Sequence, residues 1–253
     1  MCSVSWQQQH DEILICFNRD EQKNRIVAEP PRIFSESSIS TIMPIDPQGG
    51  GSWISVNQFG LFLGLLNFYD VDTELNRQKI AHEKYISRGL LLRRLSVCKA
   101  FAEVAELLSK QDLTHYMPFK LVVILDENKK LFVWNGVGLS VEKLEPFICS
   151  SSIESRSVLK YRQQQFSQAQ GDIVSLHREH TDRKDSHSIC MHRDDAETVS
   201  LSVIRINSTR VSFEYWNGSP CSSQTSELVS LEFTGEMNLN SCQNDGSIIC
   251  QNA

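Results

Sequence analysis

Short runs of alternating hydrophobic and polar residues open the chain, and this alternation is typical of β-strands. The four runs are Cys2–Trp6, Glu12–Asn18, Ser52–Val56 and Leu61–Asn67. Pro30 and Pro31 cannot donate to a strand ladder, so any strand at this point is expected at the edge of a sheet. We therefore predict four strands before the first helix.

Two later stretches place hydrophobic residues at helical spacing. The first lies between about Ser87 and Lys110 and predicts one long helix. The second runs from Ile153 to about His180, where Gly171 predicts a break between two helices. Between the two stretches, Leu121–Leu125 and Leu131–Trp134 predict two more strands.

The end of the chain predicts a loop, a hairpin and a tail. The polar stretch Thr181–Glu197 precedes the alternating runs Thr198–Ile206 and Arg210–Trp216. Residues 234–253, rich in Asn, Ser and Gln, predict a disordered tail. Strands, then helices, then strands favour antiparallel sheets covered by helices, an α+β fold, in one domain over residues 1–233.

The composition narrows the class of ligand. The formal net charge of −6 and the pI of 5.7 give no broad basic surface for nucleic acid or an anionic membrane. No stretch approaches the roughly 18 apolar residues of a membrane helix, and no apolar secretion signal follows the start. The eight cysteines are scattered and form no C-x-x-C pair, which favours reduced thiols and a cytoplasmic protein. We expect a small-molecule ligand, and the oligomeric state stays open.

Cys2 is the first candidate for chemistry. Initiator Met1 is removed when the second residue is small, which would leave a thiol and an α-amine on Cys2. An α-amine titrates near pH 8, so it can accept the thiol proton and act as the general base without a histidine. Alternatively, Cys2 is only a small residue early in the chain. The residues around it must therefore show whether it is catalytic.

The tetrapeptide at residues 18–21, Asn-Arg-Asp-Glu, supplies such surroundings at the end of the second predicted strand. A hairpin would bring it beside Cys2, where Arg19 would favour the thiolate. Asp20 could hold the α-ammonium or orient Arg19, and Asn67 offers an amide donor for an oxyanion. A solvated turn of mixed charge is the other interpretation of the tetrapeptide.

Several short motifs together resemble one family. The Met-Cys start, the tetrapeptide Asn-Arg-Asp-Glu, Gly50-Gly51-Ser52-Trp53 and Leu66-Asn67 resemble the NRDE family, also called the transport and Golgi organisation protein 2 family. Three further motifs resemble the bacterial members in particular: Ser87-Arg88-Gly89, Ser150-Ser151-Ser152 and Cys190-Met191-His192-Arg193. The resemblance covers about Met1 to Pro220.

The resemblance implies an αββα sandwich of the N-terminal-nucleophile hydrolase type, related to enzymes that cut linear amides with an N-terminal cysteine. The matching catalytic positions are Cys2 as nucleophile, Arg19 beside the thiolate, Asp20 orienting the amine or Arg19, and Asn67 as oxyanion donor. We also expect Asn18, Trp53 and His192 to bind substrate, with the role of His192 resting mainly on the resemblance. The family often has threonine at the positions of Ser52 and Leu66, and animal members have Gly-Thr-Arg-Ser where Glu197-Thr198-Val199-Ser200 stands here. The first difference is conservative, and the others leave the pocket shape and the substrate class open.

Other motifs have simpler explanations. Imidazole and thiolate are common zinc ligands, but the spacings of His177, His180, His187, Cys190 and His192 match no standard structural site. A solvated loop accounts for most of these histidines, so we expect no metal and no cofactor. The glycines at 49–51 lack the context of a phosphate-binding loop and predict a tight turn that delivers Trp53 to the pocket wall. Trp53 could equally be a core aromatic, as we expect for Trp134.

Three functions follow from these observations. The leading hypothesis is an N-terminal-cysteine amidohydrolase that cleaves linear, non-peptide amides through an acyl-thioester on Cys2. The second is a non-catalytic carrier of haem or an acyl ligand on the same scaffold, since animal relatives are associated with lipid and haem handling. The third is a thiol redox or metal protein that uses Cys2, Cys190 and His192.

Overall fold

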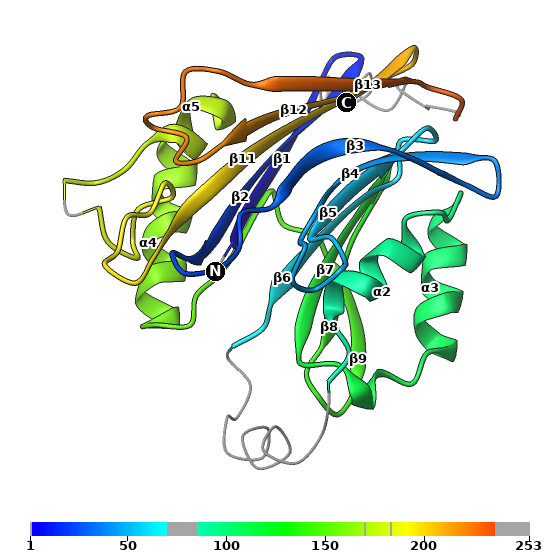
Figure 1. Cartoon of the computed structure of the whole chain (residues 1–253), viewed down its shortest axis with the longest axis horizontal. Coiled ribbons are helices and arrows are strands. Elements are labelled where there is room, and N and C mark those ends of the chain that lie inside the picture. The colour runs from blue at the N-terminus through cyan, green and yellow to red at the C-terminus, as the bar shows by residue number, and fades with distance from the viewer. Residues whose placement is uncertain (1, 70–84, 170, 183, 236–253) are drawn as a thin grey trace, which may run out of the picture.

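The structure, a computed structural model, describes residues 2–69, 85–169, 171–182 and 184–235. Within these residues two antiparallel sheets stack face to face, and helices cover the outer face of each sheet (Figure 1). The order of the layers is helices, sheet, sheet, helices. The predicted αββα sandwich is therefore confirmed.

The first sheet has six strands in the order β10-β1-β2-β11-β12-β13. Their bounds are β1 Cys2–Gln9, β2 Glu12–Gln22, β10 Phe147–Ser150, β11 Ala196–Asn207, β12 Arg210–Asn217 and β13 Glu227–Glu232. The two predicted hairpins, β1–β2 and β11–β12, pair with each other through β2 and β11. The start of the chain is thus an interior strand with a neighbour on each side.

The second sheet has seven strands in sequence order, from β3 to β9. Their bounds are β3 Glu29–Glu36, β4 Ile39–Ile45, β5 Ile54–Asn57, β6 Phe62–Asn67, β7 Phe119–Leu125, β8 Asn128–Trp134 and β9 Leu139–Lys143. Pro30 and Pro31 lie in β3, which is an edge strand as predicted. β1 of the first sheet and β6 of the second face each other across the core.

The core between the sheets is formed by apolar side chains from both. Phe17 and Ile15 from β2 meet Ile54 and Phe62 from the second sheet, and all four are fully buried. Burying such a side chain contributes roughly 1.5–3 kcal/mol. This core holds the ends of β1, β2 and β6 close together.

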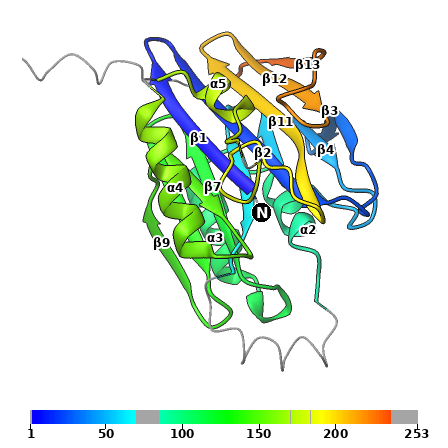
Figure 2. The same ribbon diagram turned by 90° about the vertical axis from the view of Figure 1, so that its left-hand side faces the viewer.

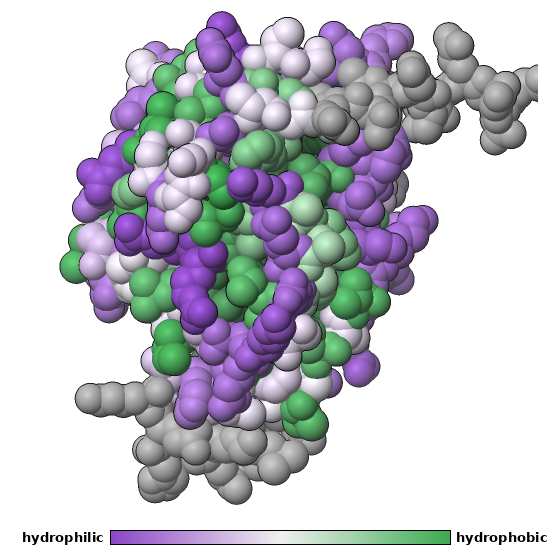
Figure 3. Space-filling model, turned by 90° about the vertical axis from the view of Figure 1, so that its right-hand side faces the viewer, coloured by the Kyte–Doolittle hydropathy of each residue, from purple (hydrophilic) through white to green (hydrophobic). Residues whose placement is uncertain are grey.

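Helices cover the outer faces (Figure 2). Helices α4, Ser155–Gln168, and α5, Ile173–Arg178, lie on the first sheet, whereas α2, Arg88–Leu95, and α3, Phe101–Lys110, lie on the second. A short 3-10 helix spans Leu113–His115. The surface on the side of α2 and α3 mixes hydrophilic and hydrophobic residues (Figure 3).

The prediction of one long helix between Ser87 and Lys110 is wrong, because two helices occupy this stretch. The side-chain amide of Asn57 donates to the carbonyl oxygens of Ser96 and Cys98, at 3.1 and 2.7 Å. Thr41 also donates to the Ser96 carbonyl, at 3.1 Å. These buried side chains from the sheet donate to backbone carbonyls that would accept from backbone N–H groups if the helix were continuous. By contrast, the predicted break at Gly171 is confirmed, with a φ of 89°.

The predicted number of strands is too small, because six strands rather than four precede the first helix. The overlooked β4 is buried along nearly its whole length. Its sequence therefore lacks the alternation that marks a strand with one solvent-exposed face. β9, β10 and β13 were also not predicted.

The predicted tail lies mostly outside the described residues. Thr234, within them, donates its backbone N–H to the carbonyl of Gln58 at 2.8 Å. Among the described residues, no helix is both long and apolar enough to cross a membrane.

Candidate active site

Cys2 begins β1, between β10 and β2. It pairs with Ser150 on one side and Arg19 on the other, and its backbone N–H donates to the Ser150 hydroxyl at 3.3 Å. The residue is half-buried and its thiol is free. Sheet pairing on both sides therefore fixes the position of the main chain of Cys2.

A cavity of about 420 Å³ opens beside Cys2, with walls from both sheets and from the start of α2. Its lining residues are Cys2, Arg19, Asp20, Glu21, Arg25, Asp46, Gly51, Ser52, Trp53, Leu65, Asn67, Tyr69, Tyr85, Ile86, Ser87, Arg88, Gly89 and Met117. Charged, amide and phenol groups share this lining with apolar side chains. The cavity is thus suited to a small ligand with a polar and an apolar part.

The glycine turn that precedes Trp53 packs against the start of α2. A Cβ on Gly51 would lie 2.2 Å from the backbone of Gly89, so only glycine allows this close approach. The turn brings Trp53 into the cavity wall, as predicted. Trp53 is only 7% exposed, and its indole Nε1 has no hydrogen-bond partner among the described residues.

Opposing effects act on the thiol of Cys2. Burial raises the pKa of Cys2, and the charge of Asp20 adds to this rise. A hydrogen bond from the backbone of Asp20 and the positive charge of Arg19 lower the pKa of Cys2. The site thus supplies a donor and a cation to a Cys2 thiolate once the proton has left.

Arg19 lies on the same face of the sheet as Cys2, because the two are paired across adjacent strands. Its guanidinium donates to Glu21 at 3.1 Å and lies 4.3 Å from the centre of the Trp53 ring. Arg25 forms ion pairs with Glu21 and with Asp46. This cluster holds Arg19 beside the thiol.

A second cation, Arg88, approaches the cavity from the start of α2. Its Nη1 donates to the carbonyl of Pro118 at 2.8 Å. Burial lowers the pKa of Arg88, while its interactions with Tyr69 and Cys2 raise it. No carboxylate within the described part of the chain lies within ion-pair distance of Arg88. Arg88 therefore adds a second positive charge at the cavity, which the more distant charge of Glu21 favours without forming an ion pair.

Asn67 is at the end of β6 and lines the cavity. Its side-chain amide donates to the hydroxyl of Tyr69 at 2.7 Å. Burial raises the pKa of Tyr69, which keeps the phenol protonated at neutral pH. Sequence reasoning missed Tyr69, whose hydroxyl hydrogen can point into the cavity while the oxygen accepts from Asn67.

The side chain of Asp20 lies on the opposite face of β2 from Arg19, toward the helical layer. Both guanidinium Nη atoms of Arg162, in α4, donate to its Oδ2 at 3.3 Å, and the hydroxyl of Thr198 donates to Oδ1 at 2.6 Å. Arg162 also donates to Ser3 Oγ at 2.7 Å and to the carbonyl of Ser186 at 3.1 Å. The side chains of Asp20 and Arg162 are completely buried.

Arg162 and Thr198 are therefore further members of the site that sequence reasoning missed. Nothing near Arg162 in the sequence distinguishes it from an ordinary helical arginine. Only the packing of α4 on β10 and its neighbours brings the guanidinium of Arg162 to the helix-covered face of the sheet, opposite the cavity and next to Cys2 in β1.

The structure does not bring Asn18 to the cavity. Its side-chain amide donates to the carbonyls of His177 and Ile189, at 2.8 and 3.1 Å, on the helix face of the sheet. Burial lowers the pKa of His177 to about 3, so this ring is neutral at physiological pH. Its Nε2 lies 2.9 Å from the hydroxyl of Ser5.

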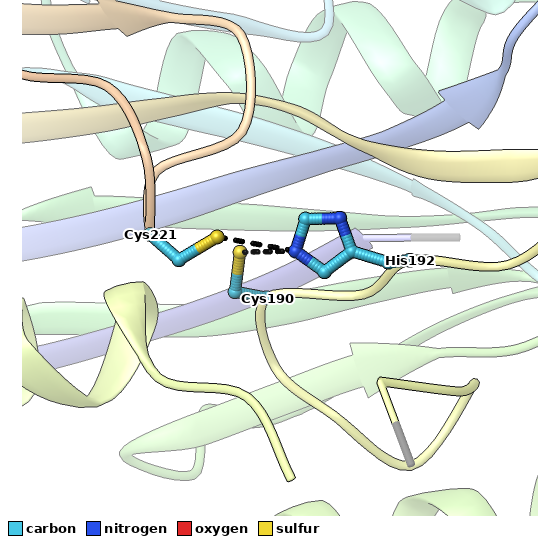
Figure 4. A group of neighbouring side chains, drawn as sticks. All are labelled: Cys190, His192 and Cys221. Atoms are coloured by element: carbon cyan, nitrogen blue, oxygen red, sulfur yellow. Dashed lines mark hydrogen bonds between the residues drawn. The ribbon is translucent and has the colours of Figure 1, made fainter. Parts of the chain in front are cut away.

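His192 does not line the cavity either. It lies with Cys190 and Cys221 in a separate group on the loops beside the first sheet (Figure 4). The structure thus brings Cys2, Arg19, Asp20, Trp53 and Asn67 together and leaves the predicted residues Asn18 and His192 outside the cavity.

The chain matches a known protein family. Residues 1–210 match the family Transport and Golgi organisation 2. The chain belongs to the Transport and Golgi organisation 2 family. The resemblance found in the sequence is therefore confirmed, and a comparison with curated proteins gave no match.

Two solved structures that match this chain have the N-terminal-nucleophile hydrolase fold. A Caenorhabditis elegans N-acylethanolamine-hydrolyzing acid amidase ortholog shares 13% identity at a TM-score of 0.55, over 90% of this chain and 100% of its own. The C2A mutant of conjugated bile acid hydrolase from Clostridium perfringens shares 14% identity at a TM-score of 0.50, over 94% of each chain. This member of the Transport and Golgi organisation 2 family thus has the N-terminal-nucleophile hydrolase fold.

Proposed function

We propose that this protein is an N-terminal-cysteine amidohydrolase that cleaves linear, non-peptide C–N amide bonds. The observation that carries the proposal is the meeting of three groups at one cavity wall. They are the Cys2 thiol, the backbone donor of Asp20 and the guanidinium of Arg19. The proposal requires removal of Met1, which leaves the α-amine on Cys2 as general base.

The reaction runs in two halves. The α-amine takes the thiol proton, Cys2 Sγ bonds to the amide carbonyl carbon, and the resulting tetrahedral oxyanion collapses. The C–N bond breaks as the α-ammonium returns the proton to the leaving amine. In the second half, the α-amine takes a proton from water, the hydroxide attacks the acyl-thioester, and the acid leaves as the thiolate is reprotonated.

Oxyanion stabilisation is assigned to Asn67 and Tyr69. Asn67 donates to the hydroxyl of Tyr69, which leaves the phenolic hydrogen free to turn toward the oxyanion. The raised pKa of Tyr69 keeps this hydrogen in place through the reaction. Fixed donors of this kind stabilise the developing charge more than water would.

The substrate is expected to combine an acyl part with a polar group. Trp53 and Leu65 supply apolar contact area, while Arg88 supplies a charged donor. The amidase and the bile acid hydrolase of the same fold act, by their names, on N-acylethanolamines and conjugated bile acids. The bile acid hydrolase variant replaces a cysteine at position 2 with alanine, the position of the proposed nucleophile here.

One observation favours the alternative of a non-catalytic carrier. Burial raises the pKa of Cys2 and so holds the residue as a thiol, which is a poor nucleophile. A carrier of haem or of an acyl ligand would use the same cavity without turnover. Such a carrier would retain its ligand in the absence of the thiol.

Amide turnover by the protein that lacks Met1 tests the proposal. A panel of N-acyl amides of different chain length would be assayed by mass spectrometry with the wild type, Cys2→Ala and Arg210→Met. We expect Cys2→Ala to lower kcat/KM by at least about a thousandfold, because the covalent step is lost. Arg210→Met, at an exposed position outside the cavity, is the control and should keep full activity.

Full activity in Cys2→Ala would contradict the proposal. Stoichiometric ligand retention by both the wild type and Cys2→Ala, without turnover, would favour the carrier instead.

A further inference from the structure

Cys190, His192 and Cys221 form a cluster of potential metal ligands separate from the cavity. Their ligand atoms lie within 4.8 Å of one another, and this is the one such group found among the described residues. His192 Nε2 lies 3.6 Å from the Cys190 sulfur and 3.2 Å from the Cys221 sulfur. Figure 4 shows both sulfurs pointing toward the same edge of the imidazole ring.

These distances match the geometry of zinc. With Zn–S bonds of about 2.3 Å and a Zn–N bond of about 2.0 Å, ligand atoms on a tetrahedral ion lie roughly 3.5 to 3.8 Å apart. The two nitrogen–sulfur separations, 3.6 and 3.2 Å, are within a few tenths of an ångström of the tetrahedral value, and the two sulfurs lie within 4.8 Å of each other. Two thiolates and an imidazole are also the donor set that Zn²⁺ prefers over hard cations.

We propose that Cys190, His192 and Cys221 bind one Zn²⁺, with the fourth position open to water or another small ligand. Binding exchanges the two thiol protons for the metal ion, and both protons pass to the solvent. The third sequence hypothesis included Cys190 and His192, but it missed Cys221, which lies 29 residues beyond His192 on a different loop.

The backbone around the cluster is held in place before any metal arrives. The N–H of Cys190 donates to the carbonyl of Glu179 at 2.9 Å, and the N–H of His192 donates to that of Lys184 at 2.7 Å. The His180 ring packs edge-on against His192, with ring centres 5.6 Å apart. Binding therefore needs little rearrangement of the chain.

The loop after β12 that holds Cys221 is fixed as well. Its Ser223 carbonyl accepts from Arg178 of α5 at 3.0 Å. Cys221 and His192 are both half-buried, so an ion can reach the cluster from solvent.

The site would connect two loops and support the back of the proposed active site. Met191 lies between two of the ligands, and its N–H donates to the hydroxyl of Thr198 at 2.8 Å. That same hydroxyl donates to Asp20. A metal at the cluster would thus fix the loop that positions Thr198 against Asp20. Its role is structural, and the proposal stands independently of the amidase activity.

Cobalt binding to the full-length protein tests the site. The protein would be stripped with a chelator, kept reduced with a phosphine, and titrated with Co²⁺ and then Zn²⁺. We expect one equivalent of Co²⁺ to give thiolate-to-metal charge-transfer absorption and the visible bands of a tetrahedral ion, both abolished by one equivalent of Zn²⁺. Mg²⁺ should have no effect, because it requires oxygen ligands.

Variants decide whether these residues are the ligands. Cys221→Ser and His192→Gln should each weaken binding by more than about a hundredfold, since loss of even an outer partner of a ligand costs 10- to 100-fold. Cys2→Ala should bind one equivalent as tightly as the wild type, because its thiol lies in the other site. Zn²⁺ should also raise the melting temperature of the wild type but not that of Cys221→Ser.

Absence of the charge-transfer band in the reduced wild type would overturn the proposal. So would a band that persists unchanged in Cys221→Ser and His192→Gln, or one that disappears in Cys2→Ala. These outcomes are independent of amide turnover, so failure of the metal site and failure of the amidase proposal are distinguishable.

Discussion

The two faces of the β1–β2 hairpin differ in what covers them: one lines a cavity, and the other encloses a buried ion pair. On the cavity face, Cys2 is half-buried, and the indole donor of Trp53 has no partner among the described residues. On the helix face, Asp20 and Arg162 are completely buried and bonded to each other. Arg162 makes a further bond there to Ser3.

The difference shows how one tetrapeptide serves two purposes. Successive side chains of a strand point to opposite faces, so Arg19 and Glu21 face the cavity while Asn18 and Asp20 face the helices. Groups left available on the cavity face can bind a ligand. Groups on the helix face hold the strands in register, and their loss should appear as lost stability.

Removing Arg162 should have the largest effect on stability. Arg162→Met would leave the carboxylate of Asp20 buried without its cation, which typically costs about 3 to 5 kcal/mol. Urea unfolding followed by circular dichroism measures the difference. Arg156→Met, at an exposed position of the same helix, is the control and should change stability by less than about 0.5 kcal/mol. Equal stability of the two variants would mean that the buried pair is not what stabilises the helix face.

The pH dependence of stability should report the next largest effect. Burial lowers the pKa of His177 to about 3, below its ordinary value of 6.5, so below pH 6.5 the unfolded chain takes up the proton first. Stability should therefore fall by about 2 kcal/mol between pH 7 and pH 5, with further loss toward pH 3. His177→Gln, which cannot titrate, should have a correspondingly flatter profile. Parallel profiles for the two proteins would contradict the assignment to His177.

The smallest expected effect is on the cavity face. The charge of Arg19 lowers the pKa of Cys2, so Arg19→Met should reduce the thiolate fraction at pH 7.5. Alkylation of Cys2 by iodoacetamide should slow by roughly three- to tenfold. Peptide mapping separates Cys2 from the other thiols, and Arg210→Met is a remote, exposed control. An unchanged rate in Arg19→Met would show that this guanidinium does not favour the thiolate.

The sequence predicts the cavity face better than the helix face. Arg19 lies opposite Cys2 because a local hairpin, with its polar turn and alternating residues, pairs them. Trp53 follows a glycine turn that the sequence also reveals. Local patterns of this kind can be recognised without knowing the rest of the chain.

The partners on the helix face come from distant parts of the chain. Arg162 and Thr198 lie 142 and 178 residues from Asp20, so no local pattern connects them to it. Cys221 joins His192 in the same way, through loops that the sheet brings together. The division at residues 96–100 between α2 and α3 likewise depends on Asn57 and Thr41 of the sheet. These features follow from packing, which hydrophobic periodicity does not reveal.

Trapping of an acyl-enzyme tests the proposed role of Cys2 most directly. The protein that lacks Met1 would be mixed with a p-nitrophenyl acyl ester, quenched in acid within seconds, and examined by intact mass and peptide mapping. The account predicts one added acyl group, located on Cys2 and absent from Cys2→Ala. An acyl group found only on other residues would contradict the account. Ester consumption without any acyl-enzyme, at the same rate in Cys2→Ala as in the wild type, would contradict it as well.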